Sequence, residues 1–232
     1  MAKSVGVILA AAGQARRMGM GRNKAYLLLQ GKPILAYSLQ FFAAWPEVKQ
    51  VVVVTGQDEI ALAEELVKNV PAAVDKTQVV VGGRERQDSV FIGLAMIATD
   101  IDWVAVHDAA RPLISSDLFL DLLAQDAPGV IPVIPVTDTV KQVDEQGMVV
   151  KTIPRSGLFM VQTPQVFQAT VLRECYSRAR AEGYYGTDDA SLLEHYGYPV
   201  KVVAGMKQNL KITTPLDLDW SEVWLQKAER GV

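Results

Sequence analysis

Short apolar runs alternate along this chain with stretches in which apolar residues recur at helical spacing. Strands are predicted where small and β-branched residues run together, at 5–10, 51–55, 78–81, 103–107, 130–134 and 200–204. Helices are predicted at 33–44, 58–69, 87–98, 116–125, 168–181, 188–196 and 215–229. Continuously apolar strands that alternate with helices are typical of a mostly parallel sheet covered on both faces. No linker divides the pattern, so we expect a single Rossmann-like α/β domain over residues 1–232.

Residues 136–163 interrupt this alternation. Two strands of alternating polarity flank residues 144–147, which end in a glycine as the turn of a β-hairpin commonly does. An isolated hairpin is marginally stable in water and needs a surface to pack on. We expect it to project as a β-arm that packs on a second copy of the chain; the alternative is an arm folded on its own core.

Composition excludes several classes of protein. Half of the 232 residues are hydrophobic and the formal net charge is −3, which argues against non-specific binding of nucleic acid. No apolar run approaches the roughly 18 residues of a membrane span, and a signal-peptide pattern is missing. The one cysteine, Cys175, excludes an internal disulfide and a cysteine-based metal cluster, and we expect it half-buried on a helix. These features favour a cytoplasmic protein, monomeric or homo-oligomeric.

A glycine-rich, basic loop over residues 13–24 follows the first strand and carries Arg16, Arg17, Arg22 and Lys24. Glycine lets backbone amides approach an anion closely, and the cations neutralise its charge. The alternative is a solvated charged turn. The glycine spacing matches neither the P-loop nor the dinucleotide-binding fingerprint. The loop therefore predicts a nucleotide site of another kind.

Polar segments also follow other predicted strands, at 82–89, 108–112 and 207–214. Ligands of open α/β sheets bind outside the carboxyl ends of the strands, so we expect these segments to converge on one rim. Two local alternatives remain: Asp108 and Arg111 as an N-cap and a surface ion pair, and His107 as a core histidine with satisfied hydrogen bonds.

The candidate site is rich in cations and glycine amides and shows no Ser-His-Asp set, paired carboxylates or metal-ligand spacing. Phosphoryl and nucleotidyl transfer suit such a site, because the attacking phosphate is already ionised at neutral pH. Catalysis then consists of alignment and stabilisation of the charge that grows on the phosphates.

A set of motifs extends from about residue 4 to residue 222: Ala11-Ala12-Gly13, Arg16-Arg17-Met18-Gly19, Lys24, Gly31-Lys32-Pro33, Gly82-Gly83, Arg86-Gln87-Asp88-Ser89, His107-Asp108-Ala109-Ala110-Arg111-Pro112, Asp138-Thr139-Val140-Lys141, Gln162-Thr163-Pro164-Gln165 and Thr187-Asp188-Asp189-Ala190-Ser191. These motifs resemble those of the sugar-nucleotidyltransferase superfamily and, within it, the 2-C-methyl-D-erythritol 4-phosphate cytidylyltransferase family. The resemblance implies that CTP and 2-C-methyl-D-erythritol 4-phosphate give 4-diphosphocytidyl-2-C-methyl-D-erythritol and pyrophosphate, a step of the non-mevalonate isoprenoid pathway.

The resemblance also implies roles for individual residues. Catalysis and phosphate binding would fall to Arg17, Lys24 and Lys211. The cytosine and ribose of CTP would be bound by Ala11, Ala12, Gly13, Gln14, Ala15, Gly83 and Ser89. The polyol phosphate would be bound by Asp108, Arg111, Thr139, Arg155, Thr163 and Thr187. Mg²⁺ would be carried by the triphosphate, without a protein ligand cluster, and the arm would form a homodimer with shared sites.

Two departures from the family pattern matter. Some members carry an acid after the glycine pair, where this chain has Arg84, so that side chain is not expected to recognise the base. Where the family commonly has Pro-Lys-Gln, this chain has Asn23-Lys24-Ala25, and we expect asparagine to relax a loop that proline would stiffen. Three alternatives stay open: a ribitol 5-phosphate cytidylyltransferase, a guanylyl- or uridylyltransferase, and a catalytically silent nucleotide-binding protein.

Overall fold

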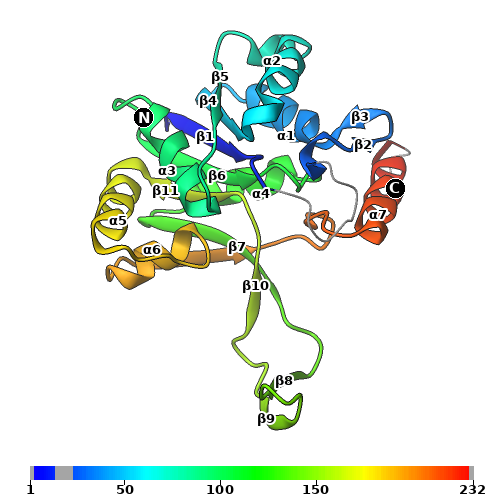
Figure 1. The fold of residues 1–232 in the computed structure, drawn as a ribbon, viewed down its shortest axis with the longest axis vertical. Coiled ribbons are helices and arrows are strands. Elements are labelled where there is room, and N and C mark those ends of the chain that lie inside the picture. Colours follow the sequence, from blue (N-terminus) through cyan, green and yellow to red (C-terminus); the bar gives the residue numbers. More distant parts are fainter. Residues whose placement is uncertain (1–2, 14–22, 230–232) are drawn as a thin grey trace.

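The computed structural model describes residues 3–13 and 23–229 and has a mixed sheet at its centre (Figure 1). Its parallel strands are β1 (Val5–Ala10), β4 (Val48–Thr55), β5 (Thr77–Val81), β6 (Trp103–Asp108), β7 (Gly129–Pro135) and β12 (Val200–Ala204). Across the sheet the order is β5-β4-β1-β6-β11-β7, and β12 and β10 also pair with β7. All six strands predicted from the sequence are present, although β4 begins at Val48 rather than at residue 51.

The antiparallel strand β11 (Gln165–Gln168) was not predicted. It lies between β6 and β7 and runs antiparallel to both. Its four residues pass directly into a helix, so neither length nor alternation marks it in the sequence. Because β11 runs the opposite way, its amino end lies at the same edge of the sheet as the carboxyl ends of its neighbours.

Helices cover both faces of the sheet, as predicted. The helices α1 (Ile34–Ala43), α2 (Ile60–Lys68) and α4 (Ser116–Ala124) pack on one face, and α3 (Arg86–Met96), α5 (Ala169–Glu182) and α6 (Asp189–His195) pack on the other. The last helix, α7 (Pro215–Glu229), instead contacts the small hairpin β2 (Leu28–Leu29) and β3 (Lys32–Pro33). The described residues also form three short 3-10 helices: η2 (Lys24–Tyr26), η3 (Gln57–Glu59) and η4 (Pro71–Ala73). In the described part of the chain, each helix is too short or too polar to span a bilayer.

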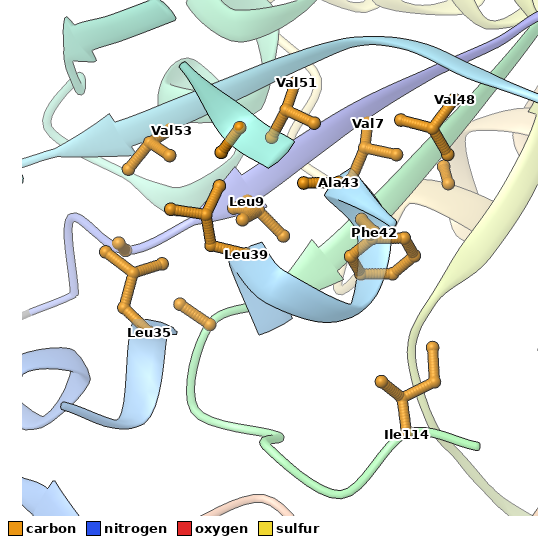
Figure 2. Close-up of a cluster of buried hydrophobic side chains, with 14 of the residues drawn as sticks. Val7, Leu9, Leu35, Leu39, Phe42, Ala43, Val48, Val51, Val53 and Ile114 are labelled. Carbon is orange, nitrogen blue, oxygen red and sulfur yellow. The ribbon is translucent and has the colours of Figure 1, made fainter. Parts of the chain in front are cut away.

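Strand residues alternate between the two cores because successive side chains point to opposite faces. Val51 and Val53 of β4 join the core under α1, whereas Val52 and Val54 join the core under α3. Figure 2 shows α1 side chains, including Phe42, directed towards the valines and leucine of β1 and β4. Such alternation between two buried faces explains why the strands read as unbroken apolar runs.

Cys175 is fully buried, so the expectation of a half-buried residue was wrong. It lies on the face of α5 that packs against the sheet, with Leu172, Tyr176 and Ala179 at helical spacing. Burial raises the pKa of its thiol to about 11. The side chain therefore serves packing.

The predicted hairpin projects from the sheet as an arm (Figure 1). It consists of β8 (Val140–Val143) and β9 (Val149–Ile153), joined by a turn in which Gly147 has a φ of +81°. The side chains of Val143, Met148 and Val149 are 55%, 67% and 60% exposed, so the arm does not fold on a core of its own chain. The chain returns through β10 (Phe159–Val161), which pairs with β7.

Candidate active site

A cavity of about 660 Å³ opens at the carboxyl ends of β1, β4, β5 and β6. It is lined by residues 10–13, 23–25, 56–57, 81–86 and 108–110, together with Ser89 and Lys211. These segments follow separate strands, and the expected convergence on one rim is confirmed. The predicted residues Gln14, Ala15 and Arg17 lie outside the described residues.

Gly82 and Gly83 line the cavity with backbone atoms, because they have no side chains. A Cβ on Gly82 would lie 2.6 Å from the Cβ of Ala12 and 2.7 Å from Oγ of Ser89, and one on Gly83 would collide with Asp88. The Ser89 hydroxyl accepts a hydrogen bond from the amide of Gly83 at 3.1 Å. The glycine pair is therefore required by close packing here, and Ser89 holds the turn that lets backbone border the cavity.

The cavity is electrically suited to an anion. Its described lining holds four cationic side chains against two carboxylates: Lys24, Arg84, Arg86 and Lys211 against Glu85 and Asp108. Clustered charge of one sign between low-dielectric walls concentrates ligands of the opposite sign.

Asp108, the last residue of β6, gathers these cations. Its Oδ2 lies 2.7 Å from Nζ of Lys211 and its Oδ1 lies 3.1 Å from Nε of Arg86. Burial alone would raise the pKa of this carboxyl group, but Arg86 and Lys211 outweigh burial and hold it well below its ordinary value. A backbone hydrogen bond of 2.8 Å from the Ile212 amide to the Ala110 carbonyl holds the Lys211 segment beside it. Asp108 is therefore a charged partner of Lys211, and the surface ion pair is excluded.

Arg86 continues the network into the core and was not assigned a role from the sequence. Its Nη2 lies 2.8 Å from Oδ2 of Asp189, a carboxylate that is fully buried. The buried Tyr176 hydroxyl donates to the other oxygen of Asp189 at 2.5 Å. Burial works against the charged guanidinium, but the two carboxylates prevail and raise the pKa of Arg86 further. Arg86 is thereby fixed at the cavity edge.

One signal in the sequence could have revealed Asp189. Two adjacent aspartates begin α6, although one suffices to cap a helix. Asp188 is that cap, and its side chain accepts from the amide of Ser191 at 2.9 Å. The second acid is therefore available for another partner, which the structure identifies as Arg86.

His107 is the satisfied core histidine that the sequence suggested. Its Nε2 lies 3.0 Å from the carbonyl of Arg111, and its Nδ1 lies 3.2 Å from Oγ1 of Thr163. The carbonyl only accepts, so Nε2 carries the proton and Nδ1 accepts from the hydroxyl. That hydroxyl in turn accepts from the amide of Asp108 at 3.0 Å. Thr163, predicted to bind substrate, therefore also orients the end of β6.

Arg111 does not belong to the lining of the cavity. Its Nη1 donates to the carbonyl of Asn209 at 2.7 Å, and its Nε lies 3.9 Å from Oδ2 of Asp108. The Asn209 amide donates to the carbonyl of Thr163 at 2.9 Å. Burial lowers the pKa of Arg111 from its ordinary value. In this chain the guanidinium thus braces the segment that leads to Lys211.

Four more predicted residues, Thr163 among them, lie outside the cavity lining. Thr139 precedes β8 and Arg155 follows β9, both exposed on the arm, and Nη1 of Arg155 donates to the carbonyl of Thr137. Thr187 lines a neighbouring cavity of about 560 Å³ that shares residues 84–86 with the first.

Asn23, which we expected to relax its loop relative to proline, is anchored by its own side chain. Asn23 is 9% exposed and caps η2, with its side-chain oxygen accepting from the amide of Ala25 at 3.1 Å. Its φ of −66° is also the angle that proline would impose.

In residues 3–13 and 23–229, no three His, Cys, Asp or Glu side chains are grouped as a protein-held metal site requires. Both oxygens of Asp108, in the cavity, already contact cations. The described donors therefore fit an ion that arrives with a bound phosphate ligand better than one that the protein holds by itself.

Replacing His107 should make the free energy of unfolding depend less strongly on pH below pH 7. Burial lowers the pKa of His107 from 6.5 to about 4, so the unfolded chain takes up a proton that the folded protein excludes. The free energy of unfolding should therefore fall as the pH drops below 6.5, by about 2 kcal/mol at pH 5 from this group.

His107→Gln keeps a donor for Arg111 and an acceptor for Thr163 but does not titrate. Urea unfolding at pH 7 and pH 5 should show that the difference in stability between wild type and variant narrows at the lower pH. An unchanged difference would mean that the pKa of His107 is the same in the folded and the unfolded chain, so that burial does not lower it.

Known proteins resemble this chain in sequence and in fold. Residues 5–227 match the family model described as 2-C-methyl-D-erythritol 4-phosphate cytidylyltransferase. Proteins of that name from Symbiobacterium thermophilum and Dehalococcoides mccartyi strain CBDB1 are 45% and 40% identical to this chain, over 97% of it and over 94% and 97% of their own lengths.

Solved structures give the same result. A 4-diphosphocytidyl-2C-methyl-D-erythritol synthase from Anaerococcus prevotii superposes with a TM-score of 0.84 at 28% identity, covering 97% of each chain. A 2-C-methyl-D-erythritol 4-phosphate cytidylyltransferase from Thermus thermophilus superposes with a TM-score of 0.78 at 32% identity, covering 97% of this chain and all of that one. Family match, sequence identity and fold together show that this chain belongs to the 2-C-methyl-D-erythritol 4-phosphate cytidylyltransferase family.

Proposed function

We propose that the chain transfers the cytidylyl group of CTP to 2-C-methyl-D-erythritol 4-phosphate and releases pyrophosphate. The observation that carries the proposal is the cavity itself. Glycine-containing backbone after β1 and β5 lines it, together with the cations Lys24 and Lys211. Membership of the family supplies the identity of both substrates.

The reaction requires no general base. An ionised oxygen of the substrate phosphate attacks the α-phosphorus of CTP in line, the bond from that phosphorus to the bridging oxygen breaks, and pyrophosphate leaves with the electron pair. Negative charge grows on the α-phosphate and on the leaving group, where Lys24, Lys211 and Arg17 stabilise it. Asp108 keeps the Lys211 ammonium at the cavity wall through its 2.7 Å contact.

Residues in and around the cavity would position the substrates. The backbone at residues 11–13 and at Gly83, with Ser89, lines the cavity and would bind the cytosine and ribose. The family resemblance adds Gln14 and Ala15 to this set. Asp108, Arg111, Thr163 and Thr187 would bind the polyol phosphate. Mg²⁺ would be held by the triphosphate and would neutralise part of its charge.

Thr139 and Arg155 would complete the site of a second copy. Both lie on an arm that projects from its own sheet, so they are remote from the lining of their own cavity (Figure 1). The exposed apolar side chains of the arm, such as Met148 and Val149, favour burial against another protein surface. We therefore propose a homodimer joined through the arms, with each site built from both chains.

The experiment that tests this function measures pyrophosphate release from CTP and Mg²⁺ with either 2-C-methyl-D-erythritol 4-phosphate or ribitol 5-phosphate. Turnover with the first substrate alone is expected. Turnover with the second alone would keep the chemistry and overturn the substrate, whereas CTP binding without turnover would indicate a silent nucleotide-binding protein.

Removing either ammonium group should slow the reaction without unfolding the protein. Lys24→Ala and Lys211→Ala are each expected to lower kcat by about 10²- to 10³-fold, the usual effect of losing one electrostatic contact to a transition state. Lys207→Ala is the matched control, because Lys207 is exposed in the same segment as Lys211 and outside the described cavity lining. Near-normal turnover of Lys24→Ala would contradict the assignment.

Mixed subunits should reveal whether the sites are shared. An Arg155→Ala chain and a Lys24→Ala chain, each nearly inactive alone, should recover part of the activity when they are refolded together, because one of the two sites in a heterodimer keeps both side chains. Recovery that saturates at a minority of wild-type turnover is expected. No recovery, with heterodimers verified by mass spectrometry, would place the whole site in one chain.

A further inference from the structure

The carboxamide of Asn23 joins three segments that border the cavity. Its Nδ2 donates to the carbonyl of Ala11, at the end of β1, at 2.5 Å and to Oε2 of Glu59, at the end of η3, at 3.1 Å. Its Oδ1 accepts from the amide of Ala25 at 3.1 Å. Both hydrogens of the amide and its oxygen are therefore engaged, at a position that is nearly buried.

These bonds determine where the chain enters η2, and Lys24 is the first residue of that turn. Asn23 holds the extended φ and ψ of −66° and 125° that an N-cap residue adopts. The capping bond to Ala25 spans Lys24, and the amide of Tyr26 adds a backbone bond to the Asn23 carbonyl at 3.1 Å. The backbone of Lys24 is thereby held between two anchored neighbours.

Glu59 is a firm anchor because it is itself fixed. Its Oε2 accepts from the amide of Gly56 at 3.0 Å and from Oγ1 of Thr55 at 3.4 Å, in addition to Asn23. Oγ1 of Thr55 gives its one proton to Glu59, so the Tyr26 hydroxyl, 2.6 Å away, donates to Thr55. Burial raises the pKa of Tyr26 to about 12 and keeps that hydroxyl protonated.

We propose that Asn23 is a positioning residue for Lys24, one that sets the reach of the ammonium group to the α-phosphate of CTP; the inference rests on the role given to Lys24 under the proposed function. An amide is the side chain that satisfies all three partners. A carboxylate would retain the oxygen that caps Ala25 but would turn acceptors towards the carbonyl of Ala11 and the carboxylate of Glu59. The backbone end of β1, which borders the cavity, would lose its tie to the turn that carries Lys24.

A double-mutant cycle tests this role. Asn23→Ala should lower kcat by about 10- to 100-fold, the scale of a misplaced catalytic group, and should raise the KM for CTP by a smaller factor. In the Lys24→Ala background the same substitution should change kcat by less than about threefold, because the group that Asn23 positions is gone. The isosteric Asn23→Asp keeps the cap of η2 and should lose at least as much kcat as Asn23→Ala.

Gln50→Ala is the matched control for a purely structural effect. The Gln50 carboxamide also clamps two backbone groups, donating to the carbonyl of Met96 at 2.8 Å and accepting from the amide of Ala98 at 2.9 Å, near the start of β4 and away from the cavity. The Gln50→Ala substitution should lower the midpoint temperature of thermal unfolding, as Asn23→Ala does, and should leave kcat within about twofold of wild type.

The outcomes separate the two proposals. A wild-type protein that does not turn over CTP with 2-C-methyl-D-erythritol 4-phosphate overturns the proposed function, and this inference with it. An active wild type in which the losses from Asn23→Ala and Lys24→Ala multiply, or in which Asn23→Asp retains wild-type kcat, overturns the positioning role alone. If Asn23→Ala does not fold, Asn23→Asp supplies the same cycle.

Discussion

The buried carboxylate of Asp108 is the interaction on which the site depends. Arg86 begins α3, Lys211 follows β12, and Asp108 ends β6, so one negative charge holds together three parts of the fold that are distant in sequence. A carboxylate with two cationic contacts can remain ionised where burial alone would protonate it. Without it, two cations would face each other at the cavity edge with no negative charge between them, and their mutual repulsion would destabilise this part of the fold.

The antiparallel strand β11 gives this cluster its support. The chain segment just before it, at the same edge as the carboxyl ends of β6 and β7, carries Gln162 and Thr163. Gln162 donates to the carbonyl of Met206 at 2.8 Å and accepts from the amide of Met206 at 3.1 Å, which docks the segment between β12 and Lys211. If β11 ran parallel to its neighbours, its amino end would lie at the opposite edge of the sheet. The segment that carries Gln162 and Thr163 would then not reach Met206.

The sequence was sufficient to predict features that depend on a periodic pattern or on a short local segment. Unbroken apolar strands with helices between them specify the sheet, and the segments after the strands specify the rim. The features that it did not predict are either very short elements or contacts between residues far apart in the chain. Strand β11 is too short to show a period, and the pairing of Arg86 with Asp189 joins residues far apart in the chain. The anchoring of Asn23 could not be predicted because its carboxamide is held by partners at the end of β1 and in η3, which only the fold brings together.

The link from Tyr176 through Asp189 and Arg86 to Asp108 has a consequence for how this protein can change over evolutionary time. Tyr176 lies in the hydrophobic core, where residues ordinarily drift among apolar side chains of similar volume. Here its hydroxyl is the hydrogen-bond donor to the carboxylate that secures an arginine of the cavity. Exchange for phenylalanine, nearly neutral for packing, would leave an oxygen of Asp189 without this donor. Selection on activity therefore extends into the interior of the molecule, to a side chain that is fully enclosed between α5 and the sheet.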